Sequence, residues 1–143
     1  MSYIQKLTSA TLRTSGITDE SVTAGANVLG STIDNSENKD VLLDVEVTWT
    51  CGSAPTSGRT VDGYIIYAVD GVNFEDGDGS TDPTKVPDFY LTTKATTSTQ
   101  KGVRTGIPIR PYPFKILLEN SLGQTATISV AVYTSNLEVI EVT

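Results

Sequence analysis

The stretch that decides the fold is VLLDVEVTWT, residues 41–50. From position 43 to position 49 every second side chain is apolar, ending with Trp49, and the side chains between them are Asp44, Glu46 and Thr48. A period of two matches a β-strand, in which successive side chains point to opposite faces. We therefore expect a strand with one face in the core and the other in water.

A second segment, VDGYIIYAV at residues 61–69, has a different pattern. Apolar side chains occupy both faces, with Tyr64 and Ile66 on one and Ile65 and Tyr67 on the other. A strand of this kind is covered on both sides. We therefore expect it to lie centrally in a sheet.

The rest of the chain continues in the same way. Further strands are expected at 89–96, 102–109, 114–119 and 126–134, and in the final segment LEVIEV. Short connections rich in Gly, Pro, Asn and Asp join them, and no segment shows a convincing helical period. The sequence predicts an all-β fold, an antiparallel β-sandwich of the jelly-roll kind.

The first 40 residues differ in composition, being rich in Ser, Thr, Asn and Gly with few apolar side chains. We expect an extended N-terminal arm over residues 1–30 and a sandwich domain over residues 31–143. An arm that cannot bury itself alone needs a partner surface, so Tyr3, Ile4 and Leu7 are interface candidates. The alternatives are a frayed tail, or short strands joined by turns.

The composition excludes several kinds of chemistry. The 143 residues contain no histidine, and Cys51 is the single cysteine, so histidine-dependent catalysis, zinc clusters and an intrachain disulfide are ruled out. Cys51 is expected to be a packing residue. The formal net charge of −7 disfavours nucleic acid, and no apolar run reaches the length of a membrane helix or a signal-peptide core. We expect a chain made in the cytoplasm, without catalytic activity.

The stretch DGVNFEDGDGSTD, residues 70–82, suggests calcium because acidic residues alternate with glycines. Counted from Asp76, an EF-hand loop needs Gly at the sixth place and Glu at the twelfth, but the chain has Thr81 and Pro87 there. The EF-hand interpretation therefore fails. A different calcium site formed by Asp76, Asp78 and Asp82 remains open beside a simple solvated turn; otherwise no cofactor is expected.

Three segments occur in this order along the chain: IDNSENKD at 33–40, GYIIYAVDGVNFEDGDGSTDP at 63–83 and GIPIRPYPFKILLENSLGQTAT at 106–127. Together they resemble a family of small structural proteins of tailed bacteriophages, over about residues 30–125. The matching positions are Ile33, Asp34, Asn35, Ser36, Asn38, Asp40, Asp70, Gly71, Asn73, Phe74, Asp76, Gly77, Pro108, Pro113, Phe114, Lys115, Leu117, Asn120 and Gly123.

The resemblance implies a non-catalytic virion component. Its favoured role is a head decoration or cement protein that binds the capsid surface as a symmetric homo-oligomer, with the major capsid protein or other virion proteins as partners. The virion would then be its location. A tail or neck structural protein is the alternative within the same family.

A carbohydrate or cell-surface binding module is the alternative outside that family. Jelly rolls use exposed aromatic side chains for this purpose, and the candidates here are Tyr64, Tyr67, Phe74, Tyr90 and Tyr112. Trp49 alternates with polar neighbours as a core residue does, which counts against a flat sugar platform. Tyr112, set among prolines, is also an interface candidate, although such a residue more often covers the core of its own domain.

Overall fold

A computed structural model describes residues 1–77, 79 and 81–142, and within them every regular element is a β-strand. The predicted all-β antiparallel sandwich is confirmed. The strands are β1 (Ser2–Leu7), β2 (Thr11–Arg13), β3 (Glu20–Val22), β4 (Asn27–Leu29), β5 (Leu42–Cys51), β6 (Thr60–Tyr67), β7 (Phe89–Thr92), β8 (Gln100–Pro108), β9 (Phe114–Ser121), β10 (Ala126–Ser135) and β11 (Leu137–Val142). The described residues include no helix able to cross a bilayer.

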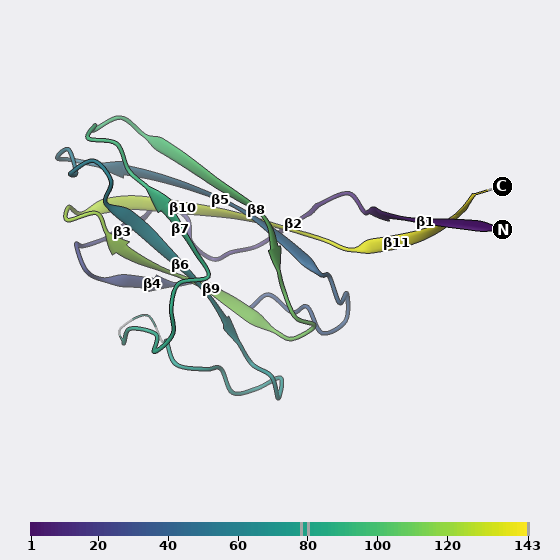
Figure 1. The fold of residues 1–143 in the computed structure, drawn as a ribbon. Coiled ribbons are helices and arrows are strands. Elements are labelled where there is room, and N and C mark those ends of the chain that lie inside the picture. The colour runs from purple at the N-terminus through teal and green to yellow at the C-terminus, as the bar shows by residue number, and fades with distance from the viewer. Residues whose placement is uncertain (78, 80, 143) are drawn as a thin grey trace.

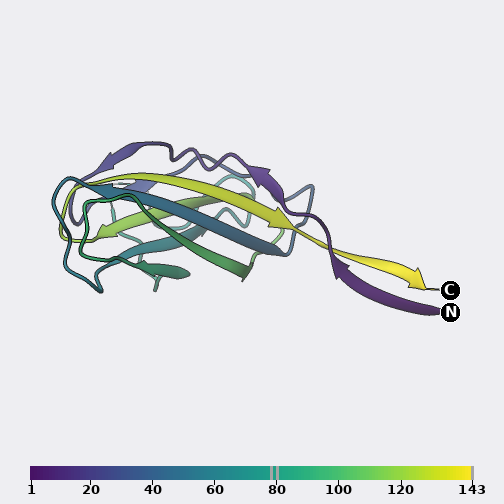
Figure 2. The same ribbon diagram turned by 90° about the horizontal axis from the view of Figure 1, so that it is seen from above.

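Two antiparallel sheets form the body (Figure 1). The first has the strand order β2-β10-β5-β8, and β3 also pairs with β10; the second has the order β4-β9-β6-β7. The third pairing, between β1 and β11, stands apart: both views show a ribbon leaving the body at the end where the termini lie (Figures 1 and 2). β8 is therefore an edge strand of the first sheet, and β7 is an edge strand of the second.

The core lies between the two sheets and is organised around β5. Along β5, buried and half-buried residues alternate from Leu42 to Cys51, as the period of two predicts. The β5–β10 ladder runs from Leu42↔Ser135 to Cys51↔Ala126. The buried Trp49 donates its indole N–H to the hydroxyl of Thr93 at 3.1 Å. Its polar group is therefore satisfied inside the core.

β6 is central, between β9 and β7, and apolar contacts cover both of its faces. Ile65 belongs to the core between the sheets. On the other face Tyr64 and Ile66 pack with Leu117, and Phe74 from the acidic loop packs against this cluster. The prediction of a strand covered on both sides is confirmed, and the loop after β6 provides the second cover.

The N-terminal segment differs from the predicted arm. Residues 11–30 contain three strands that belong to the sandwich: β2 and β3 pair with β10, and β4 pairs with β9. Ile17 is fully buried in the core between the sheets. Of the two alternatives for this segment, the structure has short strands joined by turns, and only residues 1–7 project from the body. The sequence pattern did not indicate these strands, because each is only three residues long and the segment is rich in Ser and Thr.

The motif at 33–40 has a structural role. Asn35 donates its amide N–H groups to the carbonyl oxygens of Asp40 (2.9 Å) and Arg110 (2.8 Å). The Asp40 carboxylate accepts hydrogen bonds from the Thr134 hydroxyl (2.6 Å) and from Arg13 Nη2 (3.1 Å). This network ties the loop before β5 to β10 and β2.

The motif at 120–123 acts similarly at the other end of the body. The buried Asn120 donates from its amide to the carbonyl oxygens of Val22 and Gln124, each at 2.8 Å. Gly123 has φ of 80°, the left-handed conformation that suits the short turn between β9 and β10, which carries the chain from the second sheet to the first. These motif residues stabilise loops, so their presence is explained without a ligand.

Candidate assembly interface

The ribbon is formed by the first and last strands of the described chain. β1 and β11 pair from Ser2↔Val142 to Leu7↔Leu137, and among the described residues neither strand pairs with any other. A two-stranded ribbon without a core is marginally stable in water. This element therefore has few contacts of its own to hold it.

The register places the apolar side chains on both faces of the ribbon. Directly opposite residues share a face, so one face carries Tyr3, Leu7, Leu137 and Val139, which are between 48% and 62% exposed. The opposite face carries three further apolar side chains, Ile4, Ile140 and Val142. Exposed apolar side chains gathered on one element mark an interaction site.

The sequence-predicted candidates Tyr3, Ile4 and Leu7 all lie in this ribbon, but half of the surface comes from β11. LEVIEV had been predicted only as one more strand, without a partner. LEVIEV has apolar residues at both odd and even positions, and this pattern indicates a strand that is covered on both faces. No local pattern could indicate that the two ends of the chain pair, because that contact is long-range.

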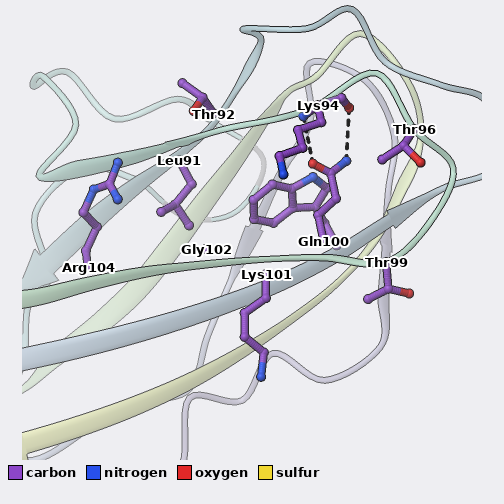
Figure 3. A pocket seen from close by; sticks show the side chains of 10 residues that line it. Leu91, Thr92, Lys94, Thr96, Thr99, Gln100, Lys101, Gly102 and Arg104 are labelled. Carbon is purple, nitrogen blue, oxygen red and sulfur yellow. Dashed lines mark hydrogen bonds between the residues drawn. The ribbon is translucent and has the colours of Figure 1, made fainter.

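A second feature lies at the open side of the sandwich, between the edge strands β7 and β8 of the two sheets (Figure 3). It is a groove of about 390 Å³. Its lining is Trp49, Leu91, Thr92, Lys94, Thr96, Thr99, Gln100, Lys101, Gly102 and Arg104. Among the described residues, three cations and no carboxylate line it, in a chain whose net charge is −7.

Polar contacts join Gln100 and Lys94 at one end of the groove, and a glycine of β8 lines it. The Gln100 amide donates to the Lys94 carbonyl (3.1 Å) and accepts from the Lys94 N–H (2.8 Å), as the dashed lines in Figure 3 mark. A Cβ at Gly102 would come within 2.8 Å of the Leu91 side chain. The two sheets thus approach closely here, and the Leu91 side chain takes the space that a side chain at position 102 would need.

The aromatic candidates for sugar binding are not brought together on one platform. Tyr64 is buried, whereas Tyr67 and Tyr112 pack edge to face with ring centroids 6.3 Å apart. Tyr112 therefore contacts its own domain. Tyr90 is the exposed exception at 56%, with the Arg104 guanidinium 5.9 Å from its ring centroid.

The loop between β6 and β7, which contains the acidic stretch, binds the backbone of β6. β7 pairs with β6 only as far as Gly63, and beyond that point loop side chains take the place of a strand. Asp88 accepts the Ile65 N–H at 2.6 Å, Glu75 accepts the Tyr67 N–H at 3.0 Å, and Lys85 donates to the Ile65 carbonyl at 2.5 Å. Sequence reasoning missed these roles, because the acidic pattern resembled a metal loop.

Asp70 shapes the turn that begins this loop. Its carboxylate accepts the N–H groups of Val72 (2.9 Å) and Asn73 (2.7 Å), and these hydrogen bonds lower the pKa of Asp70. Gly71 has φ of 83°, which suits the same turn. The turn signature DGVN therefore has a local structural cause.

The proposed calcium ligands are only partly within the described residues. Asp76 accepts a weak hydrogen bond from Thr84 at 3.3 Å, and Asp82 accepts one from the Asn27 amide at 2.8 Å; Asp78 lies outside the described residues. No group of three or more Asp, Glu or Cys in the described part of the chain is arranged to hold a metal. Calcium stays a prediction, which a calcium-dependent rise of the melting temperature would support.

Three carboxylates are near one another on the outer face of the second sheet. Burial is the main cause that raises the pKa of Glu119, followed by the charges of Asp82 and Asp62. Asp62 is the cross-strand partner of Glu119, and like charges directly opposite repel. The Tyr64 hydroxyl donates to Glu119 at 3.3 Å, and burial, with these charges, raises the pKa of Tyr64 to about 12.

Cys51 is buried at the end of β5, and its burial raises the pKa of the thiol. A protonated, enclosed thiol is a poor nucleophile. This placement agrees with a packing role.

No protein-family model and no curated protein matches the sequence. Among solved structures, the chain is similar to the N-terminal cellulose-binding domain of β-1,4-glucanase C from Cellulomonas fimi. The two share 15% identity, the match covers 85% of this chain and 78% of that chain, and the TM-score is 0.35. At this TM-score the likeness supports no conclusion about a ligand.

Proposed function

We propose that this chain is a non-catalytic structural subunit that joins a large symmetric assembly through its terminal ribbon. The observation that carries the proposal is the ribbon of β1 and β11, with exposed apolar side chains on both faces and no other strand of the described residues paired with it. Repeated attachment of identical subunits suits a rigid sandwich that presents one projecting element.

The assembly we propose is the virion of a tailed phage, and the position is the head surface, where the chain acts as a decoration or cement protein. Support comes from the order of the sequence motifs at 33–40, 63–83 and 106–127. The partners would be the major capsid protein and further copies of the same chain. A tail or neck position is the alternative, and the neighbouring genes discriminate between the two.

The test is attachment to heads purified from a phage that lacks the protein. The wild-type chain should sediment with the heads at a fixed ratio. A ribbon variant, Tyr3→Ser with Val139→Ser, should remain in the supernatant, because both side chains lie on the more apolar ribbon face. A matched variant on the body, Val86→Ser, changes a side chain that is 81% exposed and should attach normally.

Failure of the wild-type chain to attach to heads or tails would overturn the proposal. Attachment by the ribbon variant at the wild-type level would show that another surface is responsible.

The groove beside Tyr90 favours a second candidate function, carbohydrate binding. Thr92, Thr96 and Gln100 offer polar groups there, and Tyr90 offers an exposed ring. Against it, Trp49 is only 2% exposed, so its indole face is not open for stacking. A glycan array separates the two functions: signal that is lost in Tyr90→Ala would support sugar binding, and no signal would remove it.

A further inference from the structure

β8 is an open sheet edge. In the described part of the chain it pairs with β5 and with no other strand, so the N–H and C=O groups on its outer side are free to accept another strand. Edges of this kind are templates for strand addition. β11 is likewise paired on one side only, with β1.

The charges of these two strands are complementary. β8 carries Lys101 and Arg104, and β11 carries Glu138 and Glu141. Both pairs are three residues apart, so one antiparallel register places Glu138 opposite Arg104 and Glu141 opposite Lys101. Opposite charges in directly facing positions stabilise a strand pair.

The same register matches the apolar side chains. Val139 is 62% exposed and falls opposite Val103, which is 46% exposed. Ile140 falls opposite Gly102, which has no side chain and lines the groove between β7 and β8. One ribbon face would thus cover the groove, while the other would extend the outer surface of the β8 sheet.

The two cations lie on opposite faces of β8, as Figure 3 shows for Arg104 and Lys101. Lys101 already contacts Glu46 of β5 at 2.9 Å, and that pair is exposed enough to accept a second carboxylate. Arg104 makes no ion pair among the described residues; its guanidinium contacts the Tyr90 ring and donates to the Val103 carbonyl. Glu138 pairs with Lys6 of its own ribbon at 3.3 Å and is half exposed, so it can give Arg104 a carboxylate partner as well.

The contact must join two copies. Only Asn136 separates β10 from β11, and β5 lies between β10 and β8 in the sheet. The ribbon continues away from its own body (Figure 2), so β11 cannot reach the β8 edge of the same chain without unpairing.

Other pairings are disfavoured by charge. Two β11 strands aligned antiparallel about their centre would place Glu138 opposite Glu141, and like charges in such positions destabilise the pair. β1 carries Lys6 and no acid, so it has no carboxylate to offer Lys101 and Arg104.

We propose that the free edge of β11 in one copy adds antiparallel to the free edge of β8 in a second copy, with Glu138 opposite Arg104 and Glu141 opposite Lys101. This inference deepens the proposed function, on which it rests, by naming the partner of the ribbon as another copy of the chain. Every strand pair among the described residues is antiparallel, and antiparallel pairs are slightly the more stable.

Charge reversal tests the contact. Sedimentation velocity over a range of concentrations should show association of the wild-type chain that weakens with salt. Two double variants are compared with the wild-type chain: Glu138→Lys with Glu141→Lys, and Lys101→Glu with Arg104→Glu. Each should associate at least about tenfold more weakly, because two facing pairs become repulsive. An equimolar mixture of the two variants should associate again, since each reversed strand then meets an opposite charge.

The four reversed positions are exposed, so the sandwich core should stay folded. The reversals also break the Lys101–Glu46 and Lys6–Glu138 ion pairs within one chain, and the mixture of the two variants separates that effect from the contact between copies, because it restores only the latter. Glu37→Lys with Arg59→Glu, at exposed positions away from both strands, is the matched control and should associate normally. A mixture that stays monomeric while the wild-type chain associates would overturn the proposal.

Cysteine pairing tests the register. Val103→Cys with Val139→Cys should form a disulfide between copies under mild oxidation, since directly facing residues are within reach. Val103→Cys with Ile140→Cys should form no disulfide in this register. In a parallel pair that places Glu138 opposite Lys101, Ile140 would face Val103 instead. The reverse result would therefore overturn the antiparallel register. The native Cys51 is buried and present in both variants.

The outcome separates this inference from the proposed function. A wild-type chain that stays monomeric at every concentration, yet attaches to phage heads through its ribbon, overturns the pairing between copies and leaves the structural role standing. A chain that self-associates through β8 and β11 but attaches to no virion supports the pairing and overturns the virion role.

Discussion

The sandwich body and the terminal ribbon are both made of antiparallel strands, but they differ in what covers their apolar side chains. In the body, Phe114 and Ile128 are fully buried between two sheets. In the ribbon, Tyr3 and Val139 are more than 60% exposed. The same strand chemistry therefore stabilises the body from within and leaves the apolar side chains of the ribbon in contact with solvent.

This difference separates stability from assembly. The body has two sheets and an interior, so its strands bury apolar area during folding of the single chain. The ribbon has one layer, so its apolar side chains stay exposed when the single chain has folded. Substitutions in the body should change the free energy of unfolding, whereas substitutions in the ribbon should change association.

The largest effect is expected in the core of the body. Phe114→Ala removes a fully buried ring that packs against Tyr67 with centroids 6.2 Å apart. We expect it to lower the free energy of unfolding by about 3–5 kcal/mol, because a cavity replaces the ring. Urea unfolding followed by tryptophan fluorescence measures this, with Trp49 as the single reporter. A loss below about 1 kcal/mol would contradict a core position.

The next effect concerns the loop that replaces a strand beside β6. Asp88→Ala leaves the N–H of the buried Ile65 without its acceptor at 2.6 Å. An unsatisfied buried donor costs about 1–3 kcal/mol, and urea unfolding should show that loss. Asp76→Ala is the control in the same loop, since its hydrogen bond to Thr84 is exposed and 3.3 Å long. Equal losses in the two variants would contradict a special role for Asp88.

A smaller effect with a defined pH dependence is expected at Glu119. Because its pKa is raised in the folded state, the folded chain holds this proton more tightly than the unfolded chain. The contribution of Glu119 to stability therefore falls as pH rises through the unfolded pKa towards the folded pKa. Glu119→Gln should remove that fall, so the variant should gain on the wild-type protein at neutral pH and lose the advantage in acid.

At Asp70 we expect the opposite pH dependence of stability. Its pKa is lowered in the folded state, so its contribution is present above the unfolded pKa and is lost as pH falls through the folded pKa. Asp70→Asn should therefore be less stable than the wild-type chain at neutral pH, and the deficit should shrink in acid. Thermal melts between pH 3 and pH 7 compare both variants; parallel curves for the two would refute the opposed pKa shifts.

The smallest effect on stability is expected in the ribbon. Leu7→Ser changes a side chain that is 52% exposed, so the free energy of unfolding of the single chain should change by about 0.5 kcal/mol or less. If association requires the ribbon, the same substitution should weaken it. A large loss of stability in the monomer would show that the ribbon packs on its own body and would remove the contrast with Phe114.

The candidate site was predictable only in part. Tyr3, Ile4 and Leu7 were recognisable because apolar residues precede a polar segment, but their partner strand at 137–142 was not, since pairing of the two ends depends on the whole fold. The groove between β7 and β8 was likewise invisible, because its lining comes from two sheets. The acidic stretch was misleading, because carboxylates that bind backbone N–H groups have the same composition as carboxylates that bind cations.

The sequence by itself determined the strand character of the body. Alternation at 43–49 specified a strand with one buried face, and apolar residues on both faces at 61–69 specified a central one, because side-chain direction in a strand is a local property. Tertiary structure alone decided which strands end each sheet, that β2, β3 and β4 join the body, and that the two ends of the chain form one ribbon. These outcomes depend on contacts between residues far apart in the chain, and no short stretch of sequence encodes them.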